Sequence, residues 1–240
     1  MMNDRIKALC DMTLKGDMYV TPIETQFDRM NVFLTKSERD VKELCKYIMN
    51  QEPVITEYQK MTGYFNFHES GSVIGDLFHF YGHKNNGELL RYFYRKPVDD
   101  LHVFEWQHAT ADYQEVLAIG LTGIIEKIDE SLKCHFAREE QEYLLGLKKV
   151  ANTFIAWCEK CSARVLAFSK AVADPAHRAN LEKLSQTLLK VPANPPETFY
   201  EACLTIYVCF TAANDSVGTL DRYLSRFFFA DLEAGRITRA

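Results

Sequence analysis

Apolar residues recur at intervals of three and four along most of the chain, and this spacing predicts amphipathic helices. The clearest helix begins at a capping box, Asp112-Tyr-Gln-Glu115, in which an aspartate precedes a glutamate by three residues. It continues through an apolar stripe made of Val116, Leu117, Leu121, Ile124, Ile125, Ile128 and Leu132. Gly120 and Gly123 interrupt the stripe, and each costs about 1 kcal/mol relative to alanine. We therefore expect another backbone to approach this helix closely at the two glycines.

Further helices follow from local start signals. Ser37-Glu-Arg-Asp40 is a cap pattern that leads into apolar residues at helical spacing. A long helical pattern then covers about Glu139 to Val172. Asp174-Pro175 predicts the start of the next helix, with the aspartate as cap and the proline in the first helical position. Asn194-Pro-Pro-Glu197 is interpreted in the same way, with Asn194 as the cap.

Two segments do not follow the helical pattern. Residues 61–81 place several glycines among aromatic residues, which is typical of loops packed by their own rings. Thr205–Phe210 is rich in β-branched and aromatic residues. It fits a buried strand or the end of the preceding helix, and periodicity does not decide over so short a run.

The chain has 240 residues, of which 47% are hydrophobic and 25% charged, as expected of a globular protein with a sizeable core. A net charge of −5 argues against nucleic-acid binding, which needs a basic face. The most apolar run, Ala202–Ala213, is shorter than the roughly 20 residues of a membrane span. The N-terminus has no apolar signal segment. Seven scattered cysteines then indicate reduced thiols in a cytoplasmic protein.

Two cysteines have the Cys-x-x-Cys spacing of a thiol redox motif, in Trp157-Cys-Glu-Lys-Cys161. That motif needs its first cysteine at a helix start after a strand, whereas this pair lies inside a helical pattern. The simpler interpretation is two small apolar residues one turn apart. A zinc site that adds Cys134 and His135 is also conceivable. These two are adjacent, however, and one ion needs ligand pairs a few residues apart, so we expect no metal.

Two polar segments are candidates for contact with a ligand. His108 shortly precedes the predicted helix start at Asp112, where loops often deliver functional groups. A structural interpretation stays open for both, because Asp112 is a sufficient helix cap and a histidine can bond a backbone carbonyl. The second segment is the turn from Ala213 to Arg222 after an apolar run. Such a turn borders a pocket or is an ordinary surface turn.

Three stretches, in this order, carry a resemblance to a known family. Residues 105–123, from Glu-Trp-Gln-His to Gly-Leu-Thr-Gly, are similar to a Gly-His…Pro-Asp-Tyr segment and the glycine-containing helix after it. Residues 191–202 are similar to a Val-Pro…Pro-Pro…Thr-Phe-x-Glu-Ala segment. Residues 216–224 are similar to a Ser-x-Gly-Arg-x-Asp-Gln-Tyr segment. Together they resemble the glycyl radical enzymes, the family of pyruvate formate-lyase and its dehydratase relatives.

The resemblance implies a mainly α chain that forms the N-terminal helical portion of a ten-stranded α/β barrel. At most one or two barrel strands are expected, near residues 205–220. In the family a cysteine on a central loop forms a thiyl radical. A glycine near the C-terminus stores the radical, which a radical-SAM activating enzyme installs. Both residues are expected beyond Ala240, and Gly235 does not resemble the radical glycine, so no cofactor is expected on this chain.

The resemblance also implies an organisation for the chain and a set of motif positions. Residues 1–240 are expected to form one partial pyruvate formate-lyase-like domain. Its parts are helices and aromatic loops over 1–104, a helical layer over 105–200 and the start of the barrel over 201–240. The expected substrate contacts are His108, Ala213 and Asn214. The structural positions of the motifs are Asp112, Ser216, Gly218 and Asp221.

Departures from the family pattern indicate a divergent subfamily. Gln107 stands at a usual glycine, Ala111 at a usual proline and Thr219 at a usual arginine. We therefore expect the N-terminal segment of a glycyl radical lyase or dehydratase, formate C-acetyltransferase-like, that acts on a small polar metabolite. It is expected to form a homo-oligomer, to meet an activating enzyme and to be inactive alone.

An alternative from another class is a stand-alone helical interaction or regulatory protein derived from the same scaffold. This hypothesis follows from the lack of a catalytic set within the 240 residues. An incomplete barrel is expected to expose an edge at Thr205–Phe210 and the run Phe227-Phe-Phe229. Such surfaces bind a partner or aggregate.

Overall fold

The computed structural model describes residues 3–15, 35–61, 111–213 and 217–239. Within these residues every regular element is a helix, which confirms the expected mainly α chain. The seven helices are α1 (Asp4–Lys15), α2 (Lys36–Asn50), α5 (Tyr113–Leu132), α6 (Arg138–Ser169), α7 (Pro175–Leu188), α8 (Phe199–Ala213) and α9 (Leu220–Glu233). None of these described helices combines the length and the apolar character that crossing a membrane requires.

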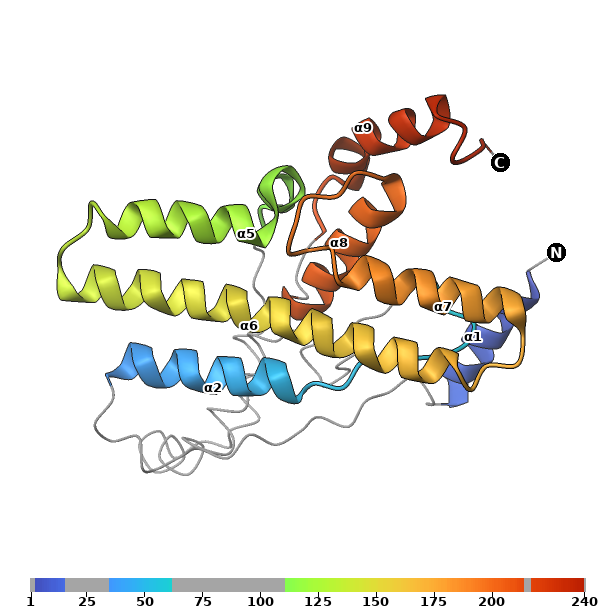
Figure 1. Cartoon of the computed structure of the whole chain (residues 1–240), viewed down its shortest axis with the longest axis horizontal. Helices are drawn as coiled ribbons and strands as arrows, with labels where there is room; N and C mark the ends of the chain where they lie inside the picture. The colour runs from blue at the N-terminus through green and yellow to red at the C-terminus, as the bar shows by residue number, and fades with distance from the viewer. Residues whose placement is uncertain (1–2, 16–34, 62–110, 214–216, 240) are drawn as a thin grey trace, which may run out of the picture.

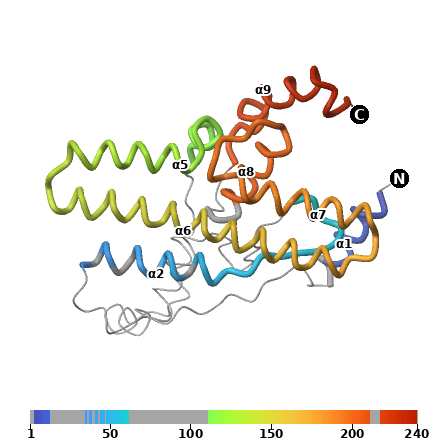
Figure 2. The backbone as a smooth tube through the Cα atoms, viewed as in Figure 1, coloured from blue at the N-terminus to red at the C-terminus, as the bar shows by residue number. Residues whose placement is uncertain are grey.

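The long helix α6 lies at the centre of the arrangement. Helix α2 runs beside it in the same direction, and α5 and α7 run back along its first and second halves (Figure 1). The tube in Figure 2 shows the two reversals, one after α5 and one after α6. Around the first half of α6, the helices α5, α6 and α2 lie side by side with α6 in the middle.

The larger apolar cluster is built on α6 and contains buried residues of α2, α6, α7 and α8. Trp157 is 1% exposed, stacks on Phe154 and donates a 3.0 Å hydrogen bond from Nε1 to the carbonyl of Gln51. Between α6 and α7, the hydroxyl of Ser162 donates to the carbonyl of Ser185 at 2.7 Å. This bond gives the buried hydroxyl of Ser162 the partner that a buried polar group needs.

A smaller apolar cluster joins the start of α5 to α8 and α9. Its buried members are Tyr113, Leu117, Ala202, Ile206 and Phe227. Because the first half of α5 packs here and its second half packs on α6, α5 connects the two clusters.

Two of the predicted helix starts are confirmed. Asp174 accepts hydrogen bonds of 2.8 and 2.9 Å from the first backbone N–H groups of α7, and Pro175 is its first residue. Asp112 caps α5 by accepting from the backbone N–H of Glu115 at 3.1 Å. In a full capping box the carboxylate of Glu115 would bond the backbone N–H of Asp112. Here that carboxylate pairs with Lys127 at 2.5 Å instead.

The predicted start of α2 is wrong by two residues. Thr35, not Ser37, is the cap, and its hydroxyl accepts from the backbone N–H of Glu38 at 3.2 Å. The carboxylate of Glu38 accepts in return from the backbone of Thr35 at 2.7 Å. The reciprocal pair satisfies two donors, which favours Thr35 over a lone hydroxyl at Ser37.

The predicted start of α8 at Asn194 is also wrong. The helix begins at Phe199, and Thr198 and Glu201 form its capping box. The prolines therefore lie in the preceding loop, where Val191-Pro192 is a cis peptide bond. Thr205–Phe210 is part of α8 and not a strand, and Thr205, 1% exposed, lies in the core instead of on an open edge.

The backbone approach expected at Gly120 is confirmed, and the one at Gly123 is wrong. Gly120 has φ 66° and ψ 176°, which breaks α5 into two helical halves. A Cβ atom there would lie 2.5 Å from the carbonyl oxygen of Ala193. At Gly123 the nearest group is instead the side chain of Ile119, one turn earlier. Glycine at position 120 is thus required by both its backbone conformation and its neighbour.

Replacing Gly120 by alanine tests this requirement. We expect Gly120→Ala to lower the free energy of unfolding by about 3 kcal/mol, because it adds a steric clash to an unfavourable backbone conformation. Urea unfolding followed by circular dichroism measures the change. Gly235→Ala is the matched control, since Gly235 has φ 68° but no atom within 4 Å of an added Cβ. The control should cost about 1 kcal/mol; equal losses would contradict a close backbone contact at Gly120.

Candidate functional site

The sequence-predicted site residues fall into two groups. His108, Asn214 and Ser216 lie outside the described residues, and Ala213 is the last residue of α8. Asp112 is the cap of α5, Gly218 has φ 61° just before α9, and Asp221 is exposed in the first turn of α9. The described residues thus flank both candidate segments.

The structure brings these flanking residues together. Tyr113, which begins α5, is 1% exposed, and its ring centroid lies 6.2 Å from that of Tyr223 in α9. Both rings belong to the smaller apolar cluster, together with Phe210 near the end of α8. The residues after His108 therefore pack against the residues on either side of Asn214.

The break in α5 is filled by the loop before α8. In an unbroken helix the backbone N–H of residue 121 would bond to the carbonyl of residue 117. Here the N–H of Leu121 donates to the carbonyl of Pro192 at 2.9 Å. Thr122 donates from its N–H and its hydroxyl to the carbonyl of Ala193, at 2.9 and 2.8 Å. The loop thus replaces the partners that the break removes, as buried backbone groups require.

The carbonyl of Leu117, released by the same break, is bonded by α9. The guanidinium of Arg226 donates to it at 3.0 Å. Leu117 is 2% exposed, so its carbonyl lies in a region where an unpaired acceptor would be costly. The arginine also lies over the ring of Phe227, 4.5 Å from its centroid.

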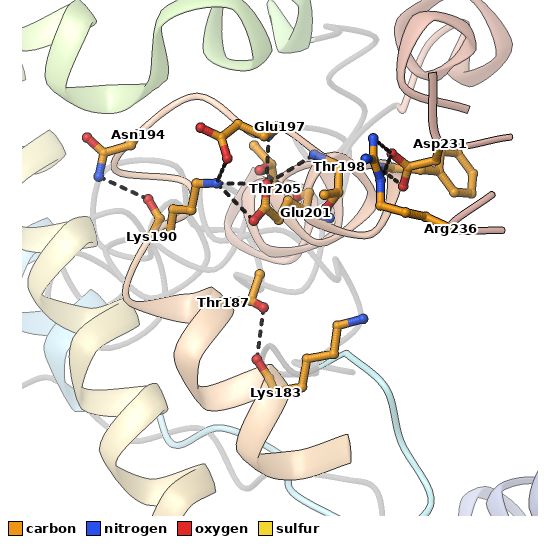
Figure 3. Close-up of polar contacts among 11 residues, drawn as sticks. Lys183, Thr187, Lys190, Asn194, Glu197, Thr198, Glu201, Thr205, Asp231 and Arg236 are labelled. Atoms are coloured by element: carbon orange, nitrogen blue, oxygen red, sulfur yellow. Dashed lines mark hydrogen bonds and ion pairs between the residues drawn. The ribbon is translucent and has the colours of Figure 1, made fainter. Parts of the chain in front are cut away.

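A polar network surrounds the start of α8 (Figure 3). The ammonium of Lys190 bonds both carboxylate oxygens of Glu201, at 3.0 and 3.1 Å, and Glu197 at 2.7 Å. Glu201 also accepts from the backbone N–H groups of Glu197 and Thr198, at 2.6 and 3.1 Å. The carboxylate of Glu201 therefore both holds the loop before α8 and caps the start of α8.

These contacts determine the charge state of Glu201. Burial opposes its ionisation, but the backbone donor of Glu197, Lys190 and the backbone donor of Thr198 outweigh it and lower the pKa of Glu201. For Lys190, burial favours the neutral form, yet the two glutamates raise its pKa. Both groups are ionised at neutral pH and stabilise the loop as a pair.

A second carboxylate ties the end of α9 to the start of α8. Asp231, 3% exposed, accepts from the backbone N–H of Phe199 at 2.9 Å and from Nε of Arg236 at 2.8 Å. Burial opposes its ionisation, but Arg236 and the Phe199 donor lower the pKa of Asp231 below the usual aspartate range. Figure 3 shows this group beside the Glu201 network.

The glycine near the end of α9 has a structural explanation. The backbone N–H of Gly235 bonds to the carbonyl of Leu232, and that of Arg236 to the carbonyl of Asp231. This pair of bonds is the Schellman motif, which favours glycine at the position with positive φ. Gly235 is also exposed, unlike a residue that must be sealed from solvent.

The Cys-x-x-Cys pair of α6 lacks the exposure and the lowered thiol pKa of a redox motif. Cys158 and Cys161 lie 2% and 1% exposed within α6, and burial raises the pKa of Cys158 well above its usual value and that of Cys161 to about 12. A redox cysteine needs a lowered pKa. Cys134 is exposed in the turn after α5, and no three histidine, cysteine or acidic side chains gather among the described residues.

Several residues join α5, the loop before α8, and α9 into what we call the junction around Gly120. Sequence reasoning missed them. Thr198-Phe-Tyr-Glu201 is itself a capping box, and this signal was available in the sequence. Lys190, Arg226 and Asp231 gave no signal. Arg226 and Asp231 bond groups 109 and 32 residues away, and Lys190 bonds glutamates 7 and 11 residues later across a loop. No local pattern encodes such pairs.

The chain is similar to known proteins over most of its length. Residues 102–240 match the family model described as pyruvate formate lyase-like. An isethionate sulfite-lyase of Bilophila wadsworthia is 25% identical over 64% of this chain and 20% of its own. The 4-hydroxyphenylacetate decarboxylase glycyl radical subunit of Clostridium scatologenes is 27% identical over 53% of this chain and 16% of its own. The chain spans about a fifth of the length of these curated relatives.

Solved structures share the fold. A structure describing 1,2-propanediol dehydration in Roseburia inulinivorans matches with a TM-score of 0.74 at 20% identity, over 100% of this chain and 38% of that chain. A glycyl radical enzyme from Archaeoglobus fulgidus matches with a TM-score of 0.64 at 19% identity, over 88% and 34%. At these identities the likeness concerns the fold.

Removing the charge of Glu201 tests the network at the start of α8. We expect Glu201→Gln to lower the free energy of unfolding by about 1–2 kcal/mol at pH 7, because charge-assisted hydrogen bonds are lost. The lowered folded-state pKa gives stability that is present above the unfolded pKa and lost as pH falls through the folded value. The two proteins should therefore converge in acid, which chemical denaturation between pH 3 and 7 measures.

Glu197→Gln is the matched control, since Glu197 shares Lys190 but its side chain is 79% exposed. Its effect should stay below about 0.5 kcal/mol. A Glu201 effect that is equally small, or that grows as pH falls, would contradict the role assigned to this carboxylate.

Proposed function

Because the chain belongs to the pyruvate formate lyase-like family of glycyl radical enzymes, we propose that it forms the N-terminal helical part of a glycyl radical lyase or dehydratase acting on a small polar metabolite. The main support for this proposal is how much of each chain the match to a solved relative covers. The whole chain has a counterpart in the structure from Roseburia inulinivorans, while most of that structure has no counterpart here. A helical segment of this kind supports a larger catalytic fold.

The catalytic radical residues are proposed to lie in the chain beyond residue 240. The cysteines here suit packing, since burial raises the pKa of Cys203 to about 11 and that of Cys209 to about 12. Gly235 serves as a helix terminator. A glycyl radical and a thiyl cysteine would supply the radical chemistry of the complete enzyme. The residues described here would form part of the helical layer that surrounds its barrel.

The substrate contacts are proposed to come from His108, Ala213 and Asn214. The contact between Tyr113 and Tyr223 supports this, because it joins the elements that follow each segment. Asp112, Gly218 and Asp221 would then fix the helix ends beside the substrate. The names of the relatives, which concern a sulfonate, a diol and a hydroxyphenylacetate, favour a small polar molecule without selecting one.

The helical layer formed by α5, α6 and α2 supports a role inside a larger assembly (Figure 1). On α6, Tyr143 is 62% exposed, Leu147 41% and Leu145 52%. Tyr143 and Leu147 lie one turn apart, whereas Leu145 points to the opposite side of the helix. Apolar side chains on both faces of the layer suit burial against further parts of the fold. The proposed division assigns helices and aromatic loops, including α2, to residues 1–104, the helical layer of α5 and α6 to residues 105–200, and the start of the barrel to residues 201–240.

The proposal is tested by radical formation. The 240-residue chain, incubated anaerobically with a glycyl radical activating enzyme and S-adenosylmethionine, should give no glycyl radical signal in electron paramagnetic resonance. The product of the uninterrupted reading frame that contains it should give one. A reading frame that continues without a cysteine loop and a glycine motif would overturn the enzyme assignment.

A stand-alone interaction protein derived from this scaffold is the second candidate, and the exposed apolar side chains of α6 favour it. Of the run Phe227-Phe-Phe229, which was expected to be exposed, Phe229 is 51% exposed, whereas Phe227 is 7% exposed and lies in the smaller apolar cluster. Light scattering on the purified chain separates the two candidates. An interaction protein should be a stable, monodisperse species with a cooperative thermal transition, whereas a part of a larger barrel should self-associate through these side chains.

A further inference from the structure

Residues 51–61, which we call the strap, are largely shielded from solvent although they form no regular element. Only Lys60 among them is exposed. The strap follows α2 and runs across α6 toward α7 (Figure 1). Segments without regular structure normally lie on the surface, where water bonds their backbone groups. The carbonyl groups of this strap therefore need donors from the protein.

We propose that the strap is a conformational device of the helical layer, anchored at its start and releasable at its end. Its start is held by α6, and its end is held by side chains of α7 and α8. It opens and closes at that end as one unit, while α2, α6 and α7 stay folded. The device stands on contacts of the described residues and does not depend on the proposed function.

The start of the strap is anchored on α6 by an indole and an ammonium group. The carbonyl of Gln51 accepts from Nε1 of Trp157 at 3.0 Å and from Nζ of Lys160 at 3.4 Å. The same ammonium donates to the carbonyl of Met49 at 2.9 Å and pairs with Glu52 at 3.0 Å. Gln51 and Trp157 are each 1% exposed. Release of this end would leave buried polar groups without their partners, which is costly.

The end of the strap is held by two neutral side-chain donors instead. Nδ2 of Asn180 in α7 donates to the carbonyl of Gln59 at 2.7 Å. The hydroxyl of Tyr200 in α8 donates to the carbonyl of Lys60 at 2.7 Å. Burial raises the pKa of Tyr200 to about 12, so this hydroxyl is protonated at neutral pH. Because neutral hydrogen bonds contribute less than charge-assisted ones, this end releases before the start.

The side chain of Gln59 couples the end of the strap to its middle. Its Oε1 accepts from the backbone N–H and from the hydroxyl of Thr56, both at 3.1 Å, and its Nε2 donates to the carbonyl of Val54 at 2.7 Å. All three residues are buried. Because Asn180 holds the backbone of Gln59, its release also frees the amide that closes the turn at Thr56. Residues 54–60 therefore open as one unit.

One buried group beside the strap favours opening. His177, in the first turn of α7, lies edge to face with Tyr58 of the strap, with ring centroids 5.4 Å apart. Its Nδ1 atom is buried and has no hydrogen-bond partner among the described residues. A buried nitrogen without a partner costs free energy, which contact with water recovers. The closed strap therefore carries a cost that opening relieves.

Native-state amide exchange on the full chain tests the device, with the amide of Thr56 as the reporter of the turn. We expect Tyr200→Phe to speed exchange at Thr56 about 5-fold, because one neutral hydrogen bond is lost. The variant keeps the ring over which the ammonium of Lys183 lies at 4.5 Å. Asn180→Ala should have the same effect. The amide of Gln51 at the anchored start and the amides in the middle of α6 should not change.

Replacing His177 tests the cost of the closed strap with the opposite sign. His177→Phe keeps a ring against Tyr58 and removes the nitrogen without a partner. We expect it to slow exchange at Thr56 about 5-fold. Exchange that does not slow would overturn the assignment of this nitrogen as the group that favours opening.

Tyr143→Phe is the matched control, since it removes the hydroxyl of a tyrosine in α6 that is 62% exposed. It should leave exchange at Thr56 unchanged. Unchanged exchange at Thr56 in either Tyr200→Phe or Asn180→Ala would overturn the proposal, because the turn would then open without the end contacts. Acceleration at Gln51 or in the middle of α6 equal to that at Thr56 would also overturn it, since the start or the whole fold would then open with the end.

Discussion

Backbone groups released by a break in a helix need new partners, and the break at Gly120 organises the part of the molecule around it. Two donors after the break bond the loop at Pro192 and Ala193, and the carbonyl before it bonds Arg226. One irregular residue thus brings together α5, the loop before α8 and α9.

The start of α8 completes this junction with charge instead of backbone pairing. Glu201 and Asp231 reach the first donors of α8 from its own first turn and from α9. Each is neutralised by a nearby cation, Lys190 or Arg236. Both carboxylates have lowered pKa values despite burial, so the junction is held by ionised groups at neutral pH. The start of α8 is therefore fixed both to the loop before it and to α9.

Sequence patterns predicted the elements of regular structure better than their contacts. The periodic helices and the Asp112 and Asp174 caps were found, because their signals are local. The close approach at Gly120 was predicted from the cost of glycine in a helix, but not which segment approaches. The start of α8 was misplaced because a proline-rich sequence resembles the first turn of a helix. Thr205–Phe210 fitted both a strand and a helix end, because burial favours the same residue types in both.

The fold of the chain corresponds to the helical part of glycyl radical enzymes, and the junction around Gly120 is what gives this part a defined geometry. Native-state hydrogen exchange at the amides of Leu121 and Thr122 tests that claim most directly. Both follow a break in the helix, yet they bond the loop carbonyls. The account predicts protection comparable to that of the middle of α6; exchange as fast as that of exposed amides would contradict it.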